Sequence, residues 1–97
     1  MNNTKWYLIK LRGDANKLSF TSVEACEIAK KIGIDFTKEK FDLKQFTKGI
    51  NVELEHGTKF KNANVTNNDP ILTGKIAYVH LLEFPDYYTR LEQLEKE

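Results

Sequence analysis

The sequence has few of the residues that cross-link a small domain. Its one cysteine, Cys26, cannot form a disulfide within the chain, and there is no cysteine cluster that would bind zinc. A chain of 97 residues must therefore fold around one modest hydrophobic core. We expect Cys26 to be a small buried filler on a helix, with a reduced and poorly reactive thiol.

Long hydrophobic runs are also missing. Only the four apolar residues 6–9 separate the polar start of the chain from Lys10, which is far short of a signal-peptide core or a membrane span. Together with the single cysteine, this favours a reducing cytoplasm as the location and excludes a membrane as the expected partner.

No charge of either sign dominates. The formal net charge is +1, so no overall field attracts nucleic acid or acidic membranes. Lys40, Lys44 and Lys48 form a row, but no aromatic residues interleave with them, and we expect a solvated helix face there. There is no glycine-rich phosphate-binding loop, and no Ser, His and Asp occur in the order of a catalytic triad. The sequence thus disfavours nucleic acid and leaves protein as the expected class of partner.

Hydrophobic periodicity predicts a mainly α protein. We expect a single domain over residues 1–97, with an amino-terminal arm over 1–20 and a helical core over 21–95. In the arm, Lys5 to Arg12 alternates as a strand does, and a turn at 13–16 could return it as a short hairpin packed on the helices. The predicted small four-helix domain has its helices near 21–32, 42–56, 69–84 and 85–95.

Capping signals mark the ends of the first two helices. Thr21 followed by Glu24 resembles a capping box, and Gly33 stands at a left-handed C-cap position. Asp42 begins the second helix, which we expect to stop at Gly57. Gly49 in the middle of that helix lowers the stability of the helix by about 1 kcal/mol relative to alanine. We therefore expect another element to pack closely against this glycine.

The helix over 69–84 is the predicted centre of the fold. Asp69 is a good N-cap and Pro70 fits the first helical position. Apolar residues cover most of its circumference, which predicts packing on more than one side. One stripe holds Leu72, Ile76 and Val79, an adjoining one holds Ile71, Tyr78 and Leu82, and the positions expected to face solvent include Thr73 and Lys75.

Four segments together resemble the signature of an uncharacterised family of small bacterial and phage-associated proteins. They are Val-Glu-Leu-Glu-His-Gly at 52–57, Asn-Val-Thr-Asn at 64–67, Thr-Gly-Lys-Ile-Ala at 73–77 and Glu-Phe-Pro-Asp-Tyr-Tyr at 83–88. The resemblance covers roughly residues 20–92. It implies a domain of unknown function, and no catalytic residue can be carried over from it.

Two short motifs could supply metal ligands. Glu53-x-x-His56 and His80-x-x-Glu83 each place a carboxylate and an imidazole on one helix face, and such pairs bind metal in di-iron bundles. The alternative, which we favour, is a structural polar network that joins the second helix to the central one. In an antiparallel helix pair the two histidines would lie roughly 12 Å apart, so we predict that they do not share one ion.

Polar residues near the carboxyl end complete the candidate site. Glu83 falls on the stripe of Leu72 and Val79, so we expect it to be mostly buried against His56, His80 or Arg90. The remaining candidates could form a recognition patch, although tyrosines more often bury their rings and leave their hydroxyls at the rim. These candidates are Asp86, Tyr87, Tyr88 and Arg90.

The sequence therefore favours a non-catalytic interaction or structural module of the cytoplasm. The alternative is a small metal-binding protein or metalloenzyme that uses a divalent metal and two motif pairs, Glu53, His56, His80 and Glu83. Without that metal we expect no cofactor.

Overall fold

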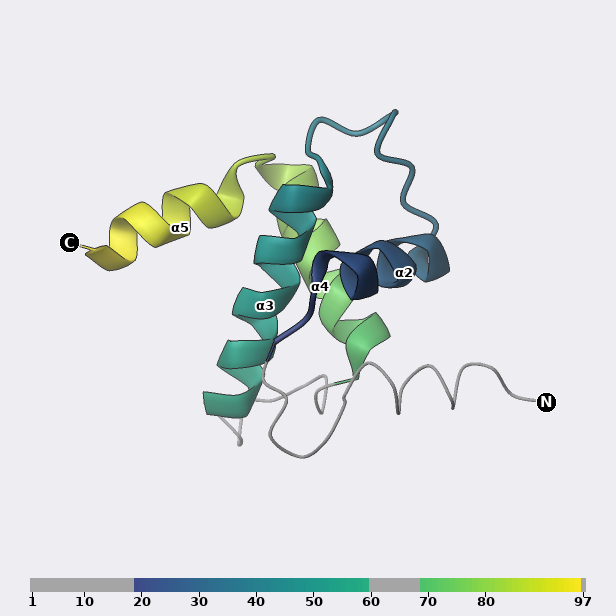
Figure 1. Cartoon of the computed structure of the whole chain (residues 1–97). Coiled ribbons are helices and arrows are strands. Elements are labelled where there is room, and N and C mark those ends of the chain that lie inside the picture. Colours follow the sequence, from purple (N-terminus) through teal and green to yellow (C-terminus); the bar gives the residue numbers. More distant parts are fainter. Residues whose placement is uncertain (1–18, 60–68, 97) are drawn as a thin grey trace.

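The computed structural model describes residues 19–59 and 69–96 of the chain, and this part is built of four α-helices (Figure 1). The predicted mainly α fold is confirmed. The predicted amino-terminal strand lies outside the described residues. In chain order the helices are α2 (Ser22–Ile32), α3 (Leu43–Lys59), α4 (Pro70–Glu83) and α5 (Tyr87–Lys96).

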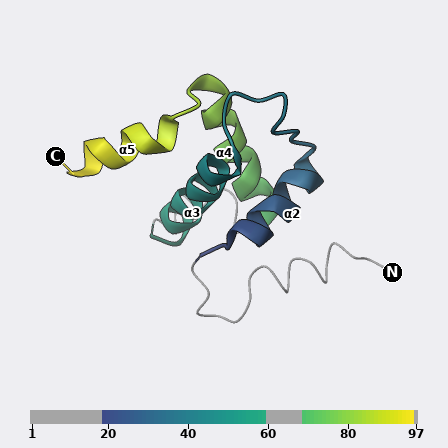
Figure 2. The same ribbon diagram turned by 45° about the horizontal axis from the view of Figure 1, so that its top comes forward.

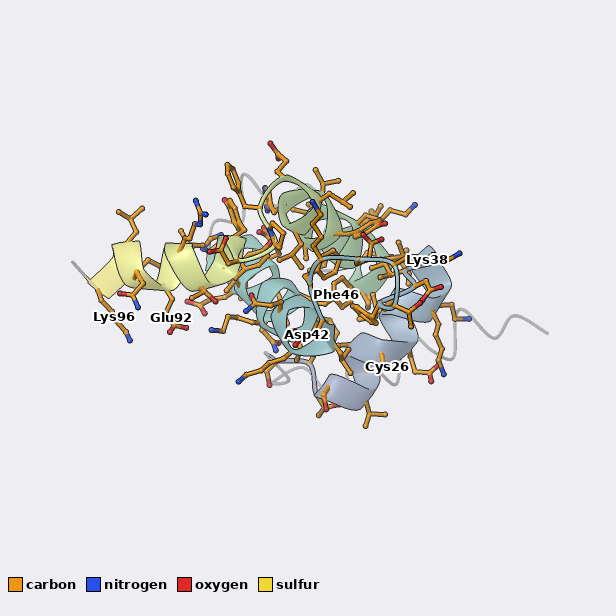
Figure 3. The ribbon with its side chains drawn as sticks, turned by 90° about the horizontal axis from the view of Figure 1, so that it is seen from above. Cys26, Lys38, Asp42, Phe46, Glu92 and Lys96 are labelled. Atoms are coloured by element: carbon orange, nitrogen blue, oxygen red, sulfur yellow. The ribbon has the colours of Figure 1, made fainter. Side chains whose placement is uncertain are left out.

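The helix α4 shares the centre of this arrangement with α3, because each of the two contacts all three of the other helices. It runs antiparallel to α3, while α2 packs on both (Figure 1). The last helix, α5, starts beside α3 and α4 and then projects away from the other three, as the tilted view in Figure 2 also shows. Seen from above, Phe46 lies among the packed helices, whereas Glu92 and Lys96 lie along the projecting α5 (Figure 3).

Side chains cap the starts of α2, α3 and α4. Thr21 and Glu24 form the predicted capping box, and Gly33 ends α2 in the left-handed conformation with φ 93°. Asp42 accepts from the amide of Gln45, and Asp69 accepts from two amides in the first turn of α4. No helix within residues 19–59 or 69–96 is both long and apolar enough to cross a membrane.

Two predicted boundaries were wrong. Helix α3 continues through Gly57 to Lys59, because Gly57 does not take the left-handed conformation that would end it; Gly33 is the glycine with positive φ among the described residues. The Thr58 hydroxyl donates to the Leu54 carbonyl inside this last turn. Helix α5 begins at Tyr87 and not at Pro85, after a short turn.

The hydrophobic core lies between α2, α3 and α4 and extends under the start of α5. Gly49 lies against Tyr88, which confirms the predicted close packing at this glycine. The buried hydrophobic residues are Phe20, Ala25, Ile28, Ala29, Ile34, Phe41, Phe46, Ile50, Leu54, Ala77, Leu81 and Tyr88. Cys26 borders this core half-buried, so it is less enclosed than expected.

The orientation of α4 differs from the prediction. Its buried side consists mostly of small residues, including Thr73, Gly74 and Ala77, whereas Leu72 and Val79 are 46% and 53% exposed. A Cβ at Gly74 would lie 2.6 Å from Ile28 Cγ2, so the small residues let α2 approach closely. Close backbone packing on the small side thus leaves Leu72, Val79 and Leu82 of α4 facing outward.

Candidate functional site: a polar cluster that joins three helices

Three polar side chains from three helices meet at one point. The Tyr88 hydroxyl on α5 donates to Glu53 Oε2 on α3 at 2.7 Å. The Nδ1 atom of His80 on α4 lies 3.1 Å from the same carboxylate oxygen and 3.0 Å from the Tyr88 hydroxyl oxygen. We call Glu53, His80 and Tyr88 the inter-helix cluster. It connects α4 to both α3 and α5.

Packing fixes the position of each group in the cluster. The Tyr88 ring is 1% exposed and lies on Gly49, where any larger residue would push it away. The Tyr87 ring stacks on the His80 imidazole with centroids 4.5 Å apart and an interplanar angle of 14°. The Glu53 side chain is 13% exposed and that of His80 is 30% exposed. The cluster is therefore mostly enclosed, with the imidazole at its edge.

The geometry selects the protonation pattern of the imidazole. Because the Tyr88 proton is directed to Glu53, an unprotonated His80 Nδ1 would face the lone pairs of two oxygen atoms. A proton on Nδ1 instead donates toward the carboxylate, which is the stronger charge-assisted bond. The geometry therefore favours the tautomer of His80 that carries a proton on Nδ1.

The surroundings of Tyr88 keep its hydroxyl protonated. Burial is the largest cause that raises the pKa of Tyr88, and the hydrogen bond to the Glu53 carboxylate raises it further. The hydroxyl is thus a permanent donor at physiological pH. This corrects the expectation that the tyrosine hydroxyls lie at the rim, because that of Tyr88 is enclosed with its ring.

The structure brings together one member of each predicted motif pair. Glu53 and His80 touch each other, one from each motif. His56 is half-buried one turn after Glu53. Glu83 is exposed, so the prediction that it is buried was wrong, because its stripe on α4 faces outward. Within residues 19–59 and 69–96 no three His, Cys, Asp or Glu side chains gather closely enough to hold a metal ion.

The two remaining candidates pair with each other outside the cluster. Arg90 donates from Nε to Asp86 Oδ1 at 2.8 Å, and both side chains are exposed. The Arg90 guanidinium also lies 5.1 Å from the centroid of the Phe84 ring. This exposed pair, four residues apart, lies at the start of α5 on either side of Tyr87 and Tyr88 in the sequence.

Sequence reasoning missed Asn51, which holds the chain at the entrance to α2. Its amide group pairs with the backbone of Phe20 in both directions, accepting from the Phe20 amide and donating to the Phe20 carbonyl at 3.0 Å. A second donor bond reaches the carbonyl of Thr47. The available signal was a polar residue of poor helix propensity in the middle of a helix.

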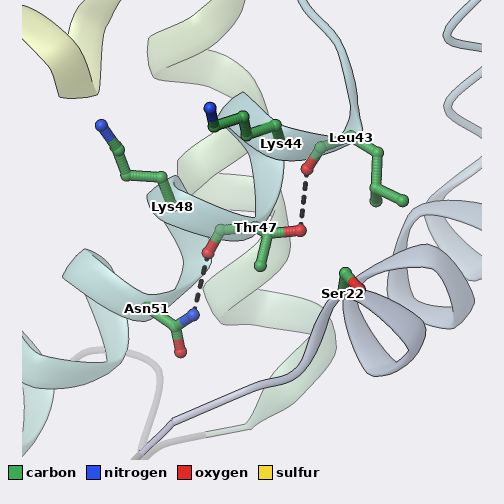
Figure 4. Close-up of a pocket in the computed structure, with 6 residues that line it drawn as sticks. All are labelled: Ser22, Leu43, Lys44, Thr47, Lys48 and Asn51. Atoms are coloured by element: carbon green, nitrogen blue, oxygen red, sulfur yellow. Dashed lines mark hydrogen bonds between the residues drawn. The ribbon is translucent and has the colours of Figure 1, made fainter.

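An open pocket of about 490 Å³ lies between the start of α2 and the first turns of α3 (Figure 4). Thr47 and Asn51 bond within α3 along its wall, and Lys44 and Lys48 stand at its rim. Lys48 pairs with Glu92 of α5 at 3.2 Å, while Lys44 is exposed. None of the inter-helix cluster lines this pocket, so the pocket brings no substrate-sized space to His80.

The arrangement thus defines a small helical protein in which a polar cluster joins three helices. The model of the family described as "Protein of unknown function (DUF5661)" matches residues 25–97, about three quarters of the chain, and the chain belongs to this family. The searches of curated proteins and of solved structures returned no significant match. The expected membership of an uncharacterised family is confirmed, whereas the bacterial and phage association stays a prediction.

Proposed function

We propose that this protein is a non-catalytic interaction module that binds a protein partner through the exposed apolar side of α4. The observation that carries the proposal is a row of large apolar residues that face outward on the central helix. We call Leu72, Ile76, Val79 and Leu82 the α4 stripe. Its three most accessible members are Leu72, Val79 and Leu82, which are 46%, 53% and 53% exposed.

The α4 stripe is a continuous feature, which separates it from ordinary surface variation. At 100° per residue, Leu72 and Val79 lie about 20° apart around the helix and Leu82 about 60° from Val79. Phe84, the residue that follows α4, is also 47% exposed. Single exposed apolar residues are normal, but a contiguous group on one element is typical of a binding surface.

The inter-helix cluster supports the same function by making the surface rigid. It ties α4 to α3 and α5 through His80, which lies on the flank of the helix between the stripe and the buried side. A surface held in one geometry loses less conformational entropy when it binds. In this proposal the carboxylate, imidazole and hydroxyl act as a structural lock and carry out no proton transfer.

The proposal is tested by photo-crosslinking at single positions of the stripe. A photoreactive residue at Val79 or Leu82 is expected to give discrete crosslinked products in the cells that make the protein, identified by mass spectrometry. The same residue at Val23 on α2 is a matched control, because that valine is 72% exposed but stands apart from other exposed large apolar residues. Equal products at all three positions, or none at Val79 and Leu82, would contradict the proposal.

A stability measurement tests whether the stripe is part of the core. Val79→Ser changes an exposed residue, so the free energy of unfolding should change by no more than about 0.5 kcal/mol. Leu81→Ala, two residues further on, removes a fully buried side chain and should cost about 2–5 kcal/mol. Similar losses for both variants in urea unfolding would mean that the stripe is covered within the protein itself.

A further inference from the structure

We propose that the open pocket between α2 and α3 binds a small amphiphilic carboxylate of the medium-chain fatty-acid class (Figure 4). The alkyl chain lies along the pocket wall, and the carboxylate lies at the ammonium group of Lys44. The pocket volume of about 490 Å³ is within the usual range of small-molecule sites, roughly 300–1,000 Å³. No residue of the α4 stripe lines the pocket, so this site is separate from the surface in the proposed function.

The wall of the pocket is apolar although several of its residues carry polar groups. The Thr47 hydroxyl donates to the Leu43 carbonyl at 2.7 Å, inside the first turns of α3. The Asn51 amide group binds the Phe20 backbone and the Thr47 carbonyl. Because these groups are bonded within the protein, the surface that lines the pocket is almost entirely apolar. An alkyl chain can therefore lie there without leaving a buried polar group unpaired.

A cationic group at the rim sets the charge of the ligand. Lys44 and Lys48 stand there, four residues apart on α3 (Figure 4). Lys48 pairs with Glu92 of α5 at 3.2 Å, whereas Lys44 is exposed and has no ion pair among the described residues. The residues that line the pocket include no Asp or Glu. An apolar wall beside an unpaired ammonium group is complementary to an alkyl chain that ends in a carboxylate.

The site is tested by titrating the full chain with sodium octanoate and following the backbone amide signals by NMR. We expect saturable shifts at Thr47 and Asn51 with a Kd on the order of 0.1–1 mM, because so few ligand atoms limit the affinity. Each buried methylene contributes up to about fourfold in affinity, so hexanoate should bind more weakly. Octylammonium and inorganic phosphate each lack one of the two features, and both should bind at least about threefold more weakly than octanoate.

Two substitutions separate the contact with the carboxylate from the contact with the alkyl chain. Lys44→Gln removes the ammonium group and should weaken octanoate binding about two- to fivefold, while the ratio of octanoate to hexanoate affinity stays the same. Ser22→Phe puts a ring at an exposed lining position and should abolish the saturable shifts. Lys40→Gln is the matched control, because Lys40 is also exposed but does not line the pocket, and its Kd should be unchanged. The amide spectrum of each variant also reports whether the variant is folded.

The opposite results overturn the site. Octanoate that gives no saturable shift at Thr47 and Asn51, or octylammonium that binds as tightly, excludes a carboxylate site in this pocket. Equal weakening by Lys44→Gln and Lys40→Gln would mean that the overall charge of the protein attracts octanoate. Saturable shifts at Leu72 and Val79 in place of the pocket amides would mean that the alkyl chain covers the α4 stripe. That result overturns the pocket site and leaves the proposed function to its own crosslinking test.

Discussion

The ring of Tyr88 lies directly on Gly49, so that a Cβ at position 49 would come within 2.5 Å of Tyr88 Cε2. The two residues are 39 positions apart in the chain, on α5 and α3. The glycine lets the tyrosine ring reach the helix surface, and the hydroxyl then reaches Glu53 in the next turn of the same helix. This contact decides where α5 attaches, and it leads to the first prediction.

Gly49→Ala should destabilise the protein although alanine is the better helix former. The gain in helix propensity is about 1 kcal/mol, whereas displacing a buried aromatic ring costs about 1–3 kcal/mol and also breaks the Tyr88 hydrogen bond. We expect a net loss of about 1–2 kcal/mol in urea unfolding. In a Tyr88→Ala background the ring is absent, so the same change should be neutral or stabilising. A destabilisation of equal size in both backgrounds would mean that Tyr88 is not the cause.

The Tyr88 hydroxyl should make stability fall at alkaline pH. Burial and the bond to Glu53 raise the pKa of Tyr88 in the folded state, so the protonated hydroxyl favours folding. This contribution is fully present below the ordinary tyrosine pKa of about 10. Above that pH it falls, by up to about 1.4 kcal/mol per pH unit, until the raised pKa of the folded state is reached.

Tyr88→Phe isolates this effect. Near pH 8 the variant should be less stable by about 1 kcal/mol, because the hydrogen bond is lost, and the difference should shrink or reverse above pH about 10. Tyr78→Phe is the matched control. The hydrogen bond to Glu39 also raises the pKa of Tyr78, but this residue is only half-buried, so its effect should be smaller. A difference between the protein and Tyr88→Phe that stays constant from pH 8 to 11 would contradict the prediction.

His80→Ala should change stability and leave metal content unchanged. The variant removes the donor to Glu53 and the stacking partner of Tyr87, which together contribute about 1–3 kcal/mol. Elemental analysis of protein purified without a histidine tag provides the second measurement, with His56→Ala measured beside it. Near-stoichiometric zinc, iron or manganese that is lost in both variants would reject the structural role and support the metal site.

Asn51→Ala should loosen the entrance to α2. The variant leaves both the amide and the carbonyl of Phe20 without their partner, which costs about 1–3 kcal/mol for partly buried groups. Thr47→Ala is a suitable control on the same helix, because its hydroxyl donates only to Leu43 one turn earlier. We expect faster hydrogen exchange at Phe20 in Asn51→Ala and not in Thr47→Ala. If the exchange rate at Phe20 were the same in both variants, the buried ring of Phe20 alone would hold this segment in place.

The parts of the fold that depend on neighbouring residues could be predicted from the sequence. The Thr21 capping box and the Asp69 N-cap are set by side chains within three residues of the amides that they bind. The close contact at Gly49 was also predictable, since a mid-helix glycine has a cost that packing can offset. Its partner Tyr88 could not be named, because the turn at Pro85 determines how α5 returns to α3.

The orientation of α4 could not be predicted from periodicity. Apolar residues occur on nearly every side of this helix, so the pattern gives no preferred face. The buried side was selected by Gly74 and its small neighbours, which permit close approach of Ile28 and Ile32. Exposure of Glu83 and the α4 stripe follows from that selection. Glu53 and His80 could be chosen as candidates, but their contact with Tyr88 depends on three helices at once.

Three residues within little more than one turn of α3 contact parts of the chain that are distant in sequence. Gly49, Asn51 and Glu53 hold the Tyr88 ring, the Phe20 backbone and the His80 imidazole, respectively. Their partners lie 27 to 39 residues away in sequence, so these contacts close long loops of chain. Because closing such loops costs chain entropy, we expect these contacts to form late, on a helix that already exists. We therefore expect α3 to be helical in the transition state for folding before these contacts form, so that a change that removes only such a contact, as Tyr88→Phe does, speeds unfolding more than it slows refolding.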